Sequence, residues 1–300
     1  MAFDLVVVGH FSQDKIITPD MQREEMGGVP AYSLFLTSWG LKLGIVSKCS
    51  PEFLMRYGTR IRRSGAILAV SGQKTTEFTN IYRLNGTRTQ EVGNVAGMIR
   101  LTDFPEPFYK ANVVHFGPII GELNTEIIRN VHSVGLMVSL DLQGFCRGLD
   151  GRKVIEKPWN TAEEVLPYVH VLKTTSNELM LVATSNSDEK DVIRWIMDLG
   201  TKIVIVTRGS AGASIFTESK EIVVPALPTC TVDPTGAGDV FVLAFLATYI
   251  RSDNILDAAV FGTACAALTT EEMGPPLKFE QKKLDVMVKI ARKTSEVRNN

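Results

Sequence analysis

Short apolar runs rich in β-branched residues alternate along the chain with longer segments that carry the signals of helices. Several runs are apolar throughout, as strands buried on both faces of a sheet are. This alternation predicts an α/β protein, a three-layer sandwich with a central, mostly parallel sheet. The predicted strands cover residues 5–9, 42–49, 111–117, 135–144, 169–175 and 202–209. The predicted helices cover residues 31–39, 51–64, 124–134, 163–166, 189–199, 238–250, 254–270 and about 280–292.

Two polar stretches interrupt the alternation, at residues 11–27 and 72–95. Both are polar, with period-two patterning, and Asn85-Gly86 is a strong hairpin signal. They predict a small β-sheet that stands off the main body as a lid, because long insertions in compact domains are usually functional. The alternative is a surface hairpin without a role. With no linker in sight, residues 1–300 are expected to form one domain, whose polar end 295–300 frays.

Composition excludes several classes of function. The net charge is -1 and the charged residues of both signs are interspersed, so no nucleic-acid partner is expected. The apolar run Val240–Ile250 is far shorter than the ~20 residues of a membrane span. The start, MAFDLVVVGH, lacks the basic region of a signal peptide. We therefore expect a soluble, cytoplasmic protein with no membrane partner, and no pair of cysteines or histidines shows the spacing of a metal site.

The segment 230–250, CTVDPTGAGDVFVLAFLATYI, carries the strongest chemical signal. Its glycine turn leads directly into an apolar helix, whose first amides have no partner inside the helix and form an anion site. Asp239 falls in the first helical turn. One reading is a favourable first-turn acid, worth about 0.3–1 kcal/mol. The two neighbouring glycines favour a second reading, in which Asp239 takes the proton of an attacking hydroxyl and the amides of Gly236, Ala237 and Gly238 stabilise a transferred phosphoryl group.

Other phosphate-binding motifs are absent from the sequence. There is no G-x-x-x-x-G-K-[ST] run, and the G-x-G at 236–238 lacks the third glycine of a dinucleotide fingerprint. The H-R-D and D-F-G pairs of protein kinases are missing too. An oxidoreductase on a dinucleotide fold is therefore disfavoured.

The run DPTGAGD at 233–239 resembles the D-T-x-G-A-G-D signature of the ribokinase-like, or PfkB, carbohydrate kinases. Four further segments agree in order and spacing, and together they span nearly the whole chain. The start VVVGHFSQDKI resembles the family's first strand, and the resemblance implies that Asp14 grips substrate hydroxyls. Gly27 and Gly28 resemble the signature G-G-x-x-x-N. Tyr32 stands where many sugar kinases have Asn, which argues against plain ribose as substrate.

The resemblance also implies a site for nucleotide and Mg2+. VLKTTSNEL at 171–179 resembles the N-x-x-E segment, with Glu178 positioning Mg2+ through water and Thr175 in place of the Asn; Asn177 is the alternative in a shifted register. The alternative is that Glu178 is only an acidic residue that stabilises the first turn of a helix. The implied nucleotide contacts are Thr175, Thr207, Gly209, Gly212 and Thr263. Asp233 lies in the region where many relatives hold a monovalent cation, so K+ is a further implied cofactor.

HFGPI at 115–119 and LDLQGFCR at 140–147 look most like the subgroup of inositol kinases and archaeal sugar kinases. Asp141, Gln143 and Arg147 follow a strand end, where α/β sheets bind ligands. Each of these side chains can contact substrate or phosphate. The alternative is a polar side chain that is hydrogen-bonded within the protein at the strand end.

Together these signals predict transfer of the γ-phosphoryl group of ATP to a hydroxyl of a sugar or cyclitol, with a myo-inositol-like polyol favoured. A nucleoside kinase of the same family is the alternative within enzymes. A sugar- or nucleotide-binding regulator without turnover is the alternative outside them. Because lids in the family often pair, a homodimer through the lid is a further implication.

Overall fold

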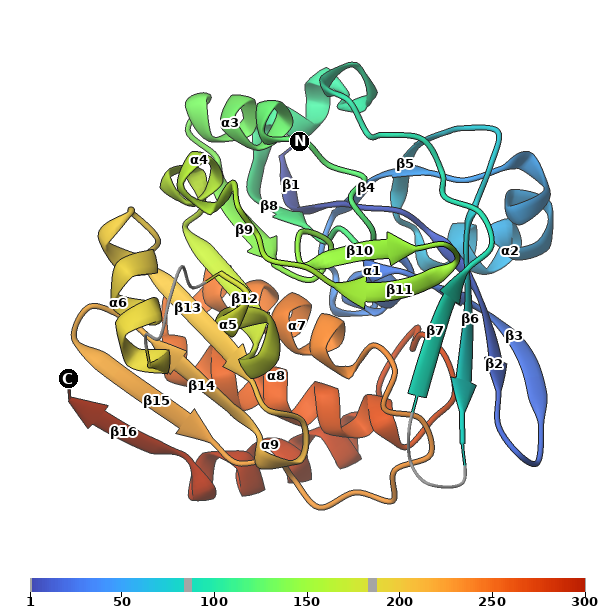
Figure 1. Ribbon diagram of the computed structural model, residues 1–300. Coiled ribbons are helices and arrows are strands. Elements are labelled where there is room, and N and C mark those ends of the chain that lie inside the picture. Colours follow the sequence, from blue (N-terminus) through green and yellow to red (C-terminus); the bar gives the residue numbers. More distant parts are fainter. Residues whose placement is uncertain (1, 84–87, 183–187, 300) are drawn as a thin grey trace.

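The computed structural model describes residues 2–83, 88–182 and 188–299. The described residues form a sheet of ten strands in the order β16-β15-β14-β13-β12-β9-β8-β1-β4-β5, and neighbours from β13 to β5 run parallel (Figure 1). The strands are β1 (Phe3–Val8), β4 (Leu43–Lys48), β5 (Ile67–Ser71), β8 (Ala111–Phe116), β9 (Met137–Asp141), β12 (Val171–Thr175), β13 (Ile203–Thr207), β14 (Ala213–Phe216), β15 (Lys220–Val224) and β16 (Glu296–Asn299).

Helices cover both faces of this sheet, as the apolar strands require. In β1, Leu5 and Val7 face one apolar cluster while Val6 and Val8 face the other. The first cluster holds α1 (Val29–Tyr32), α2 (Pro51–Ser64), α7 (Ala237–Ser252), α8 (Ile255–Thr270) and α9 (Gln281–Thr294). The second holds α3 (Thr125–Ser133), α4 (Ala162–Val165), α5 (Ser176–Met180) and α6 (Glu189–Asp198). The predicted three-layer α/β sandwich is confirmed.

A second sheet has six strands in the order β10-β11-β7-β6-β2-β3, and we call it the small sheet. Only the β2–β6 pair in it is parallel. Figure 1 shows β2, β3, β6 and β7 at the side of the main body, with β10 and β11 reaching across to join them. Its strands are β2 (Ser12–Ile17), β3 (Gln22–Gly27), β6 (Thr76–Tyr82), β7 (Arg88–Val92), β10 (Arg147–Asp150) and β11 (Lys153–Glu156).

The sequence located four strands of the small sheet and missed two. The hairpin β10–β11 continues the sheet beyond 11–27 and 72–95, because its strands of four residues are too short to show a pattern. Asp150-Gly151, with Gly151 at φ 58°, is the turn signal that could have located it. The predicted turn at Asn85-Gly86 lies outside the described residues.

Two predictions of local structure are wrong. Residues 31–39 were expected as one α-helix, but Leu34–Trp39 forms a 3-10 helix after α1. The hydroxyls of Ser33, Thr37 and Ser38 each donate to the carbonyl three residues earlier, which suits the tighter 3-10 geometry. The C-terminal end was expected to fray, yet β16 pairs antiparallel with β15, because that strand otherwise presents an open edge.

None of the helices in the described parts of the chain is both long and apolar enough to cross a membrane.

Candidate active site

A cavity of about 880 Å³ opens between the carboxyl ends of the parallel strands and the small sheet. Strands β12 and β13 contribute Lys173, Thr175 and Thr207 to its wall, and the amino end of α7 contributes Asp239. On the other side, β2, β6, β7 and β10 of the small sheet line it. This is the edge where open α/β sheets bind ligands.

Residues 233–239, which we call the signature turn, end at the first turn of α7 and border this cavity. Gly236 is the N-cap residue of α7, and its φ of 77° lies in the left-handed region that glycine tolerates best. A Cβ at this position would lie 2.0 Å from the ring of Tyr32. The buried ring of Tyr32 thus packs against the turn, and only a glycine at position 236 leaves room for this contact.

The amides of the signature turn have few hydrogen-bond partners within the protein. Ala237 N donates a long hydrogen bond of 3.4 Å to Pro234 O. Within the described parts of the chain, no hydrogen bond is formed by the amides of Gly236 and Gly238, and no side chain caps the helix. Two amides without a hydrogen bond and one weakly bonded amide therefore lie at the cavity wall, available to an anion.

The Asp239 carboxyl group has the electrostatics of a base. Its surface is only half-buried, because one side faces the cavity, but protein atoms enclose the rest. This loss of water is the main reason that its pKa is raised to about 7, and the negative charge of Asp141 adds to it. The positive charges of Lys173 and Arg147 act in the opposite direction.

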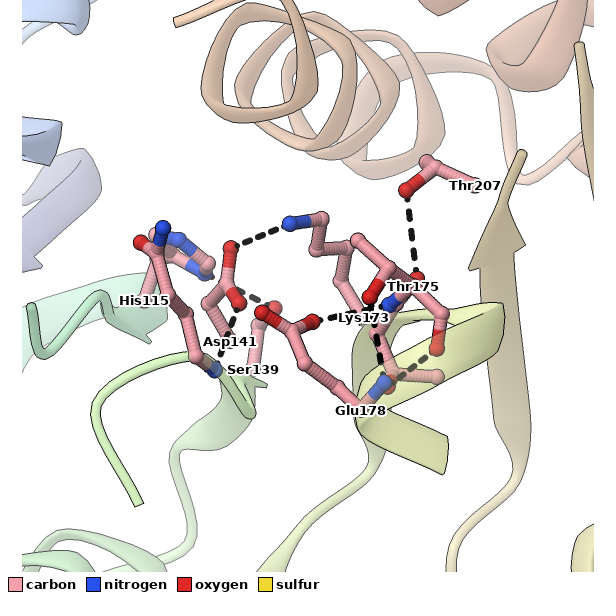
Figure 2. A network of polar contacts seen from close by, with 9 residues as sticks. His115, Ser139, Asp141, Lys173, Thr175, Glu178 and Thr207 are labelled. Atoms are coloured by element: carbon pink, nitrogen blue, oxygen red, sulfur yellow. Dashed lines mark hydrogen bonds and ion pairs between the residues drawn. The ribbon is translucent and has the colours of Figure 1, made fainter. Parts of the chain in front are cut away.

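Lys173, which the sequence analysis did not single out, is a buried cation below the signature turn. Its Nζ lies 2.8 Å from Asp141 Oδ2, and both side chains are almost fully buried (Figure 2). A Cβ on Gly238 would lie only 3.3 Å from the same Nζ. Burial alone would lower the pKa of Lys173, but the charges of Asp141, Glu178 and Asp239 raise it. Its position, as a charged residue inside the apolar strand VLKTT, is the signal that could have revealed it.

His115 lies beside Asp141 in the same network but is unsuited to act as the base. Its Nδ1 shares a hydrogen bond of 3.0 Å with Ser139 Oγ, and the side chain is fully buried. Burial lowers the pKa of His115 to about 4, with the charge of Lys173 contributing. His115 is thus neutral and lies outside the cavity lining, whereas Asp239 is the carboxyl group of the signature turn that lines the cavity.

Thr175 and Glu178 form a capping box at the start of α5. Thr175 N donates to Glu178 Oε2 at 2.9 Å, and Glu178 N donates to Thr175 Oγ1 at 3.2 Å (Figure 2). Among the described residues, no group of three His, Cys, Asp or Glu side chains could cage a metal. Mg2+ that is bound mainly by phosphates and water needs one or two carboxylates and no such cage, so Glu178 fits that ion.

Asp233 does not fit the predicted monovalent cation. Its Oδ2 accepts an ion-paired hydrogen bond from Arg23 of β3, and its Oδ1 accepts one from Thr235 N at 3.0 Å. The nearby carbonyl of Thr270 accepts from Val232 N at 2.7 Å and from Asp233 N at 3.1 Å. The oxygen atoms that would coordinate K+ thus already accept hydrogen bonds from protein groups. The residues of this structure therefore do not fit a K+ site at Asp233.

Most residues that the sequence singled out border the one cavity. Of the remainder, Gly27 packs behind Asp14, since a Cβ there would lie 2.4 Å from Asp14 Oδ2, while Glu178 and Asp233 lie outside the lining. The predicted residues that line the cavity are Asp14, Gly28, Tyr32, Gln143, Arg147, Thr175, Thr207, Gly209, Gly212, Gly236, Ala237, Gly238, Asp239 and Thr263.

Ser12, Phe78 and Gln90 of the small sheet also line the cavity but were missed. Ser12 Oγ donates to Asp14 Oδ1 at 2.8 Å and orients that carboxylate. Phe78 and Gln90 lie on strands in the predicted lid, and period-two patterning alone does not indicate which side of a strand faces a ligand.

Comparison with known proteins agrees with this geometry. Residues 152–282 match the model of the pfkB family carbohydrate kinases. Cytidine kinase from Thermococcus kodakarensis is 28% identical over 281 residues, covering 90% of this chain and 97% of that protein. Inositol 3-kinase from Arabidopsis thaliana is 22% identical over 289 residues, covering 92% and 76%. A pyrophosphate-dependent kinase in the ribokinase family, solved with a pyrophosphate analog and myo-inositol, superposes with a TM-score of 0.80 at 22% identity, covering 94% and 99%.

The fold, the cavity and these relatives define a phosphotransferase that acts on a hydroxyl acceptor. More particularly, residues 152–282 match the pfkB family carbohydrate kinases, and the chain is a sugar or nucleoside kinase with the ribokinase fold.

Proposed function

We propose that this chain transfers the γ-phosphoryl group of ATP to a hydroxyl of a small polyol, with a myo-inositol-like cyclitol favoured as acceptor. One observation supports this most directly: the Asp239 carboxyl, the signature-turn amides and the Lys173 ammonium meet at one cavity. A base, an anion site and a cation within one cavity are what phosphoryl transfer to an alcohol requires.

The acceptor binds at the end of the cavity lined by the small sheet. Asp14, Gln90 and Gln143 offer carboxylate and amide groups there, which can hold several hydroxyls at once. Arg147 adds a cation, and its Nη1 also donates to Ile119 O at 3.3 Å. The many polar groups around this end favour a compact polyol over an apolar acceptor.

The nucleotide binds at the opposite end, past the carboxyl end of β13. The lining there is small or apolar, with Gly212, Leu227 and Ala266, and Thr207 and Thr263 provide hydroxyls. Such a slot suits a flat base and a ribose. A donor without a base, such as pyrophosphate, would leave it unfilled, which favours ATP.

The residues of the chain account for each proton and charge in the transfer. Asp239 accepts the proton as the acceptor oxygen attacks the γ-phosphorus, and the bond to the β-phosphate oxygen breaks. The turn amides and Lys173 stabilise the negative charge on the transferred group. Glu178 would hold Mg2+ through water, and that ion would neutralise charge on the nucleotide phosphates. Closure of the small sheet excludes water, which would otherwise compete as acceptor.

A nucleoside kinase is the second candidate. It is favoured by the 28% identity with a cytidine kinase across 97% of that protein. The acceptor would then be a ribose hydroxyl. Phe78 in the lining could stack on the base of the nucleoside.

A panel of donors and acceptors tests these proposals. Purified protein with Mg2+ is given ATP, GTP, ADP or pyrophosphate, each with myo-inositol, ribose, fructose, cytidine or adenosine, and phosphorylated product is measured by phosphorus NMR. We expect the highest kcat/KM for ATP with myo-inositol or a related cyclitol. Cytidine as the best acceptor would establish the nucleoside kinase instead. No product from any pair, with a ligand that still raises the melting temperature, would establish a regulator without turnover.

A further inference from the structure

The ion pair between Arg23 and Asp233 joins two parts of the chain that lie 210 residues apart. Arg23 belongs to β3 of the small sheet, and Asp233 begins the signature turn. Only 16% of the Arg23 side chain and 7% of the Asp233 side chain are exposed, so water screens the pair weakly. The small sheet therefore delivers a positive charge to the turn that carries the proposed base.

That charge has a function in phosphoryl transfer. The signature turn must gather negative charge from the transferred group, and an uncompensated carboxylate beside it would oppose this. The charge of Asp233 does reach the cavity: after burial, the charges of Asp14, Asp233 and Asp239 raise the pKa of Tyr32, whose ring supports Gly236. A cation beside Asp233 is thus needed to cancel this negative charge, so that the turn amides can stabilise the transferred phosphoryl group fully.

A monovalent metal ion could supply the charge only by displacing Arg23. The displaced guanidinium would lose its bond to Asp233, while its other amino group, Nη1, is already buried and has no hydrogen-bond partner within the described residues. Leaving a buried cation without a partner is costly, so the exchange is unfavourable.

We infer that Arg23 replaces the monovalent cation in this kinase, neutralising Asp233 and fixing the signature turn, so that activity does not depend on K+. The inference rests on the proposed function. Arg23 is a positioning residue in this arrangement, since it acts on the reaction through Asp233. Because Arg23 comes from the small sheet, the anion site is complete only when β3 lies against the turn.

Two neighbouring ion pairs provide a matched control. Glu24 and Glu25, the next residues of β3, pair with Arg56 and Arg60 of α2. The Glu24–Arg56 pair also ties β3 to the main body, but both side chains are well exposed and neither contacts Asp233. Arg56→Gln therefore removes one arginine at the same junction and leaves the signature turn intact.

The test compares wild type, Arg23→Gln, Arg23→Lys and Arg56→Gln in KCl and in choline chloride of equal ionic strength. We expect wild type and Arg56→Gln to have the same kcat in both salts. Arg23→Gln should lose about tenfold or more of kcat in choline, since one misplaced or unneutralised group at an anion site costs that much. Added K+, or guanidinium at sub-denaturing concentration, should restore part of it, and Arg23→Lys should retain more activity than Arg23→Gln.

A second readout needs no turnover. The melting temperature of Arg23→Gln should be higher in KCl than in choline chloride, because K+ can occupy the vacated carboxylate, whereas that of wild type should not differ between the salts. A requirement of wild type for K+ would overturn the inference, and so would full activity of Arg23→Gln in choline or its loss with no rescue by either cation. If no acceptor is phosphorylated at all, the proposed function fails, and the melting temperatures still decide whether Arg23 takes the place of the ion.

Discussion

Asp239 gains the properties of a base from what surrounds it. An aspartate in water is ionised at neutral pH but binds protons weakly, so it is a poor proton acceptor. Enclosure by the protein and the charge of Asp141 raise its pKa to about 7, which brings its proton affinity near the range in which general bases work best. Lys173 and Arg147 limit the rise and keep part of the population ionised.

Replacement of Asp239 tests its role directly. We expect Asp239→Asn to lower kcat by about 10²–10⁴-fold, the usual contribution of a general base, and to leave nucleotide affinity nearly unchanged. Steady-state kinetics and nucleotide titration measure the two effects. Asp257→Asn, which changes a first-turn acid of α8 that does not line the cavity, is the matched control and should keep wild-type turnover. Near-normal turnover in Asp239→Asn would remove it from the base role.

The raised pKa of Asp239 also predicts a pH dependence. Because the base must be deprotonated, kcat/KM should rise with pH through about 7 and level off above it. Stability should move in the opposite direction, since folding favours the protonated carboxyl and this contribution is lost as pH rises through about 7. The melting temperature of Asp239→Asn, relative to wild type, should therefore increase across the same range. A kcat/KM profile that is flat through neutrality would contradict the assignment.

At the scale of elements, the amino end of α7 and the carboxyl end of β12 together make the anion site. The helix presents amides that have no partner inside it, and the strand places Lys173 under them. Neither element would suffice alone, because amides carry only partial charges and a buried lysine needs the compensation that Asp141 gives.

Gly236→Ala should disrupt this junction. The added Cβ would meet the Tyr32 ring at 2.0 Å, so the turn must shift, and misplacement of a catalytic group by about 1 Å can cost about 10²-fold in rate. Gly135→Ala is the control, since Gly135 also has a positive φ of 85° but open space around it. It should lose only about 1–2 kcal/mol of stability, the cost of the left-handed backbone, and no activity. Equal activities of the two variants would contradict the close contact.

Substitution of Lys173 separates its charge from its structural role. Lys173→Gln leaves Asp141 buried without a partner and should reduce the free energy of unfolding by about 3–5 kcal/mol. The double variant Lys173→Gln with Asp141→Asn should recover much of that stability, because no charge remains buried, but not the turnover. Denaturant unfolding and kcat, measured on wild type and both variants, distinguish the roles. Recovery of turnover in the double variant would show that Lys173 acts only on the fold.

At the scale of the whole molecule, the cavity exists because two sheets meet. The main body provides Asp239 and the turn amides at the start of α7 together with Lys173 of β12, and the small sheet provides most of the proposed acceptor contacts. In the structure described here, β3 is held to the body by Arg23, Glu24 and Glu25, each in an ion pair. The pairs of Glu24 and Glu25 are partly exposed and can open and close at low cost, whereas the Arg23–Asp233 pair is nearly buried and costly to break.

The lid role of the small sheet predicts a change in backbone protection on binding. Hydrogen exchange in β2, β3 and β6 should slow when acceptor and a non-hydrolysable ATP analogue are both present, and less with either alone. Exchange in α3, which packs in the second apolar cluster and contributes no residue to the cavity lining, serves as the internal reference. Identical exchange of the small sheet with and without ligands would contradict closure.

Much of the fold could be predicted from sequence because its signals are local. Six strands of the parallel sheet were located from their apolar runs, namely β1, β4, β8, β9, β12 and β13, and α2 was located as well. The strands that were missed are β5, β14 and β15 of the main sheet, the four-residue strands β10 and β11, and the tail that becomes β16 only by pairing with β15. Such segments become strands because they pair with a neighbouring strand, so their own sequence gives little indication of their structure.

The sequence by itself determined the signature turn, since its glycines, the helix that follows and Asp239 are contiguous and need only local backbone chemistry. Tertiary structure decided what surrounds that turn: the pKa of Asp239, the pairing of Lys173 with Asp141, and the placement of Arg23 on Asp233 where a metal ion was expected. The reason is physical. Desolvation and ion pairing depend on distances in space between residues remote in the chain, and no local pattern specifies those distances.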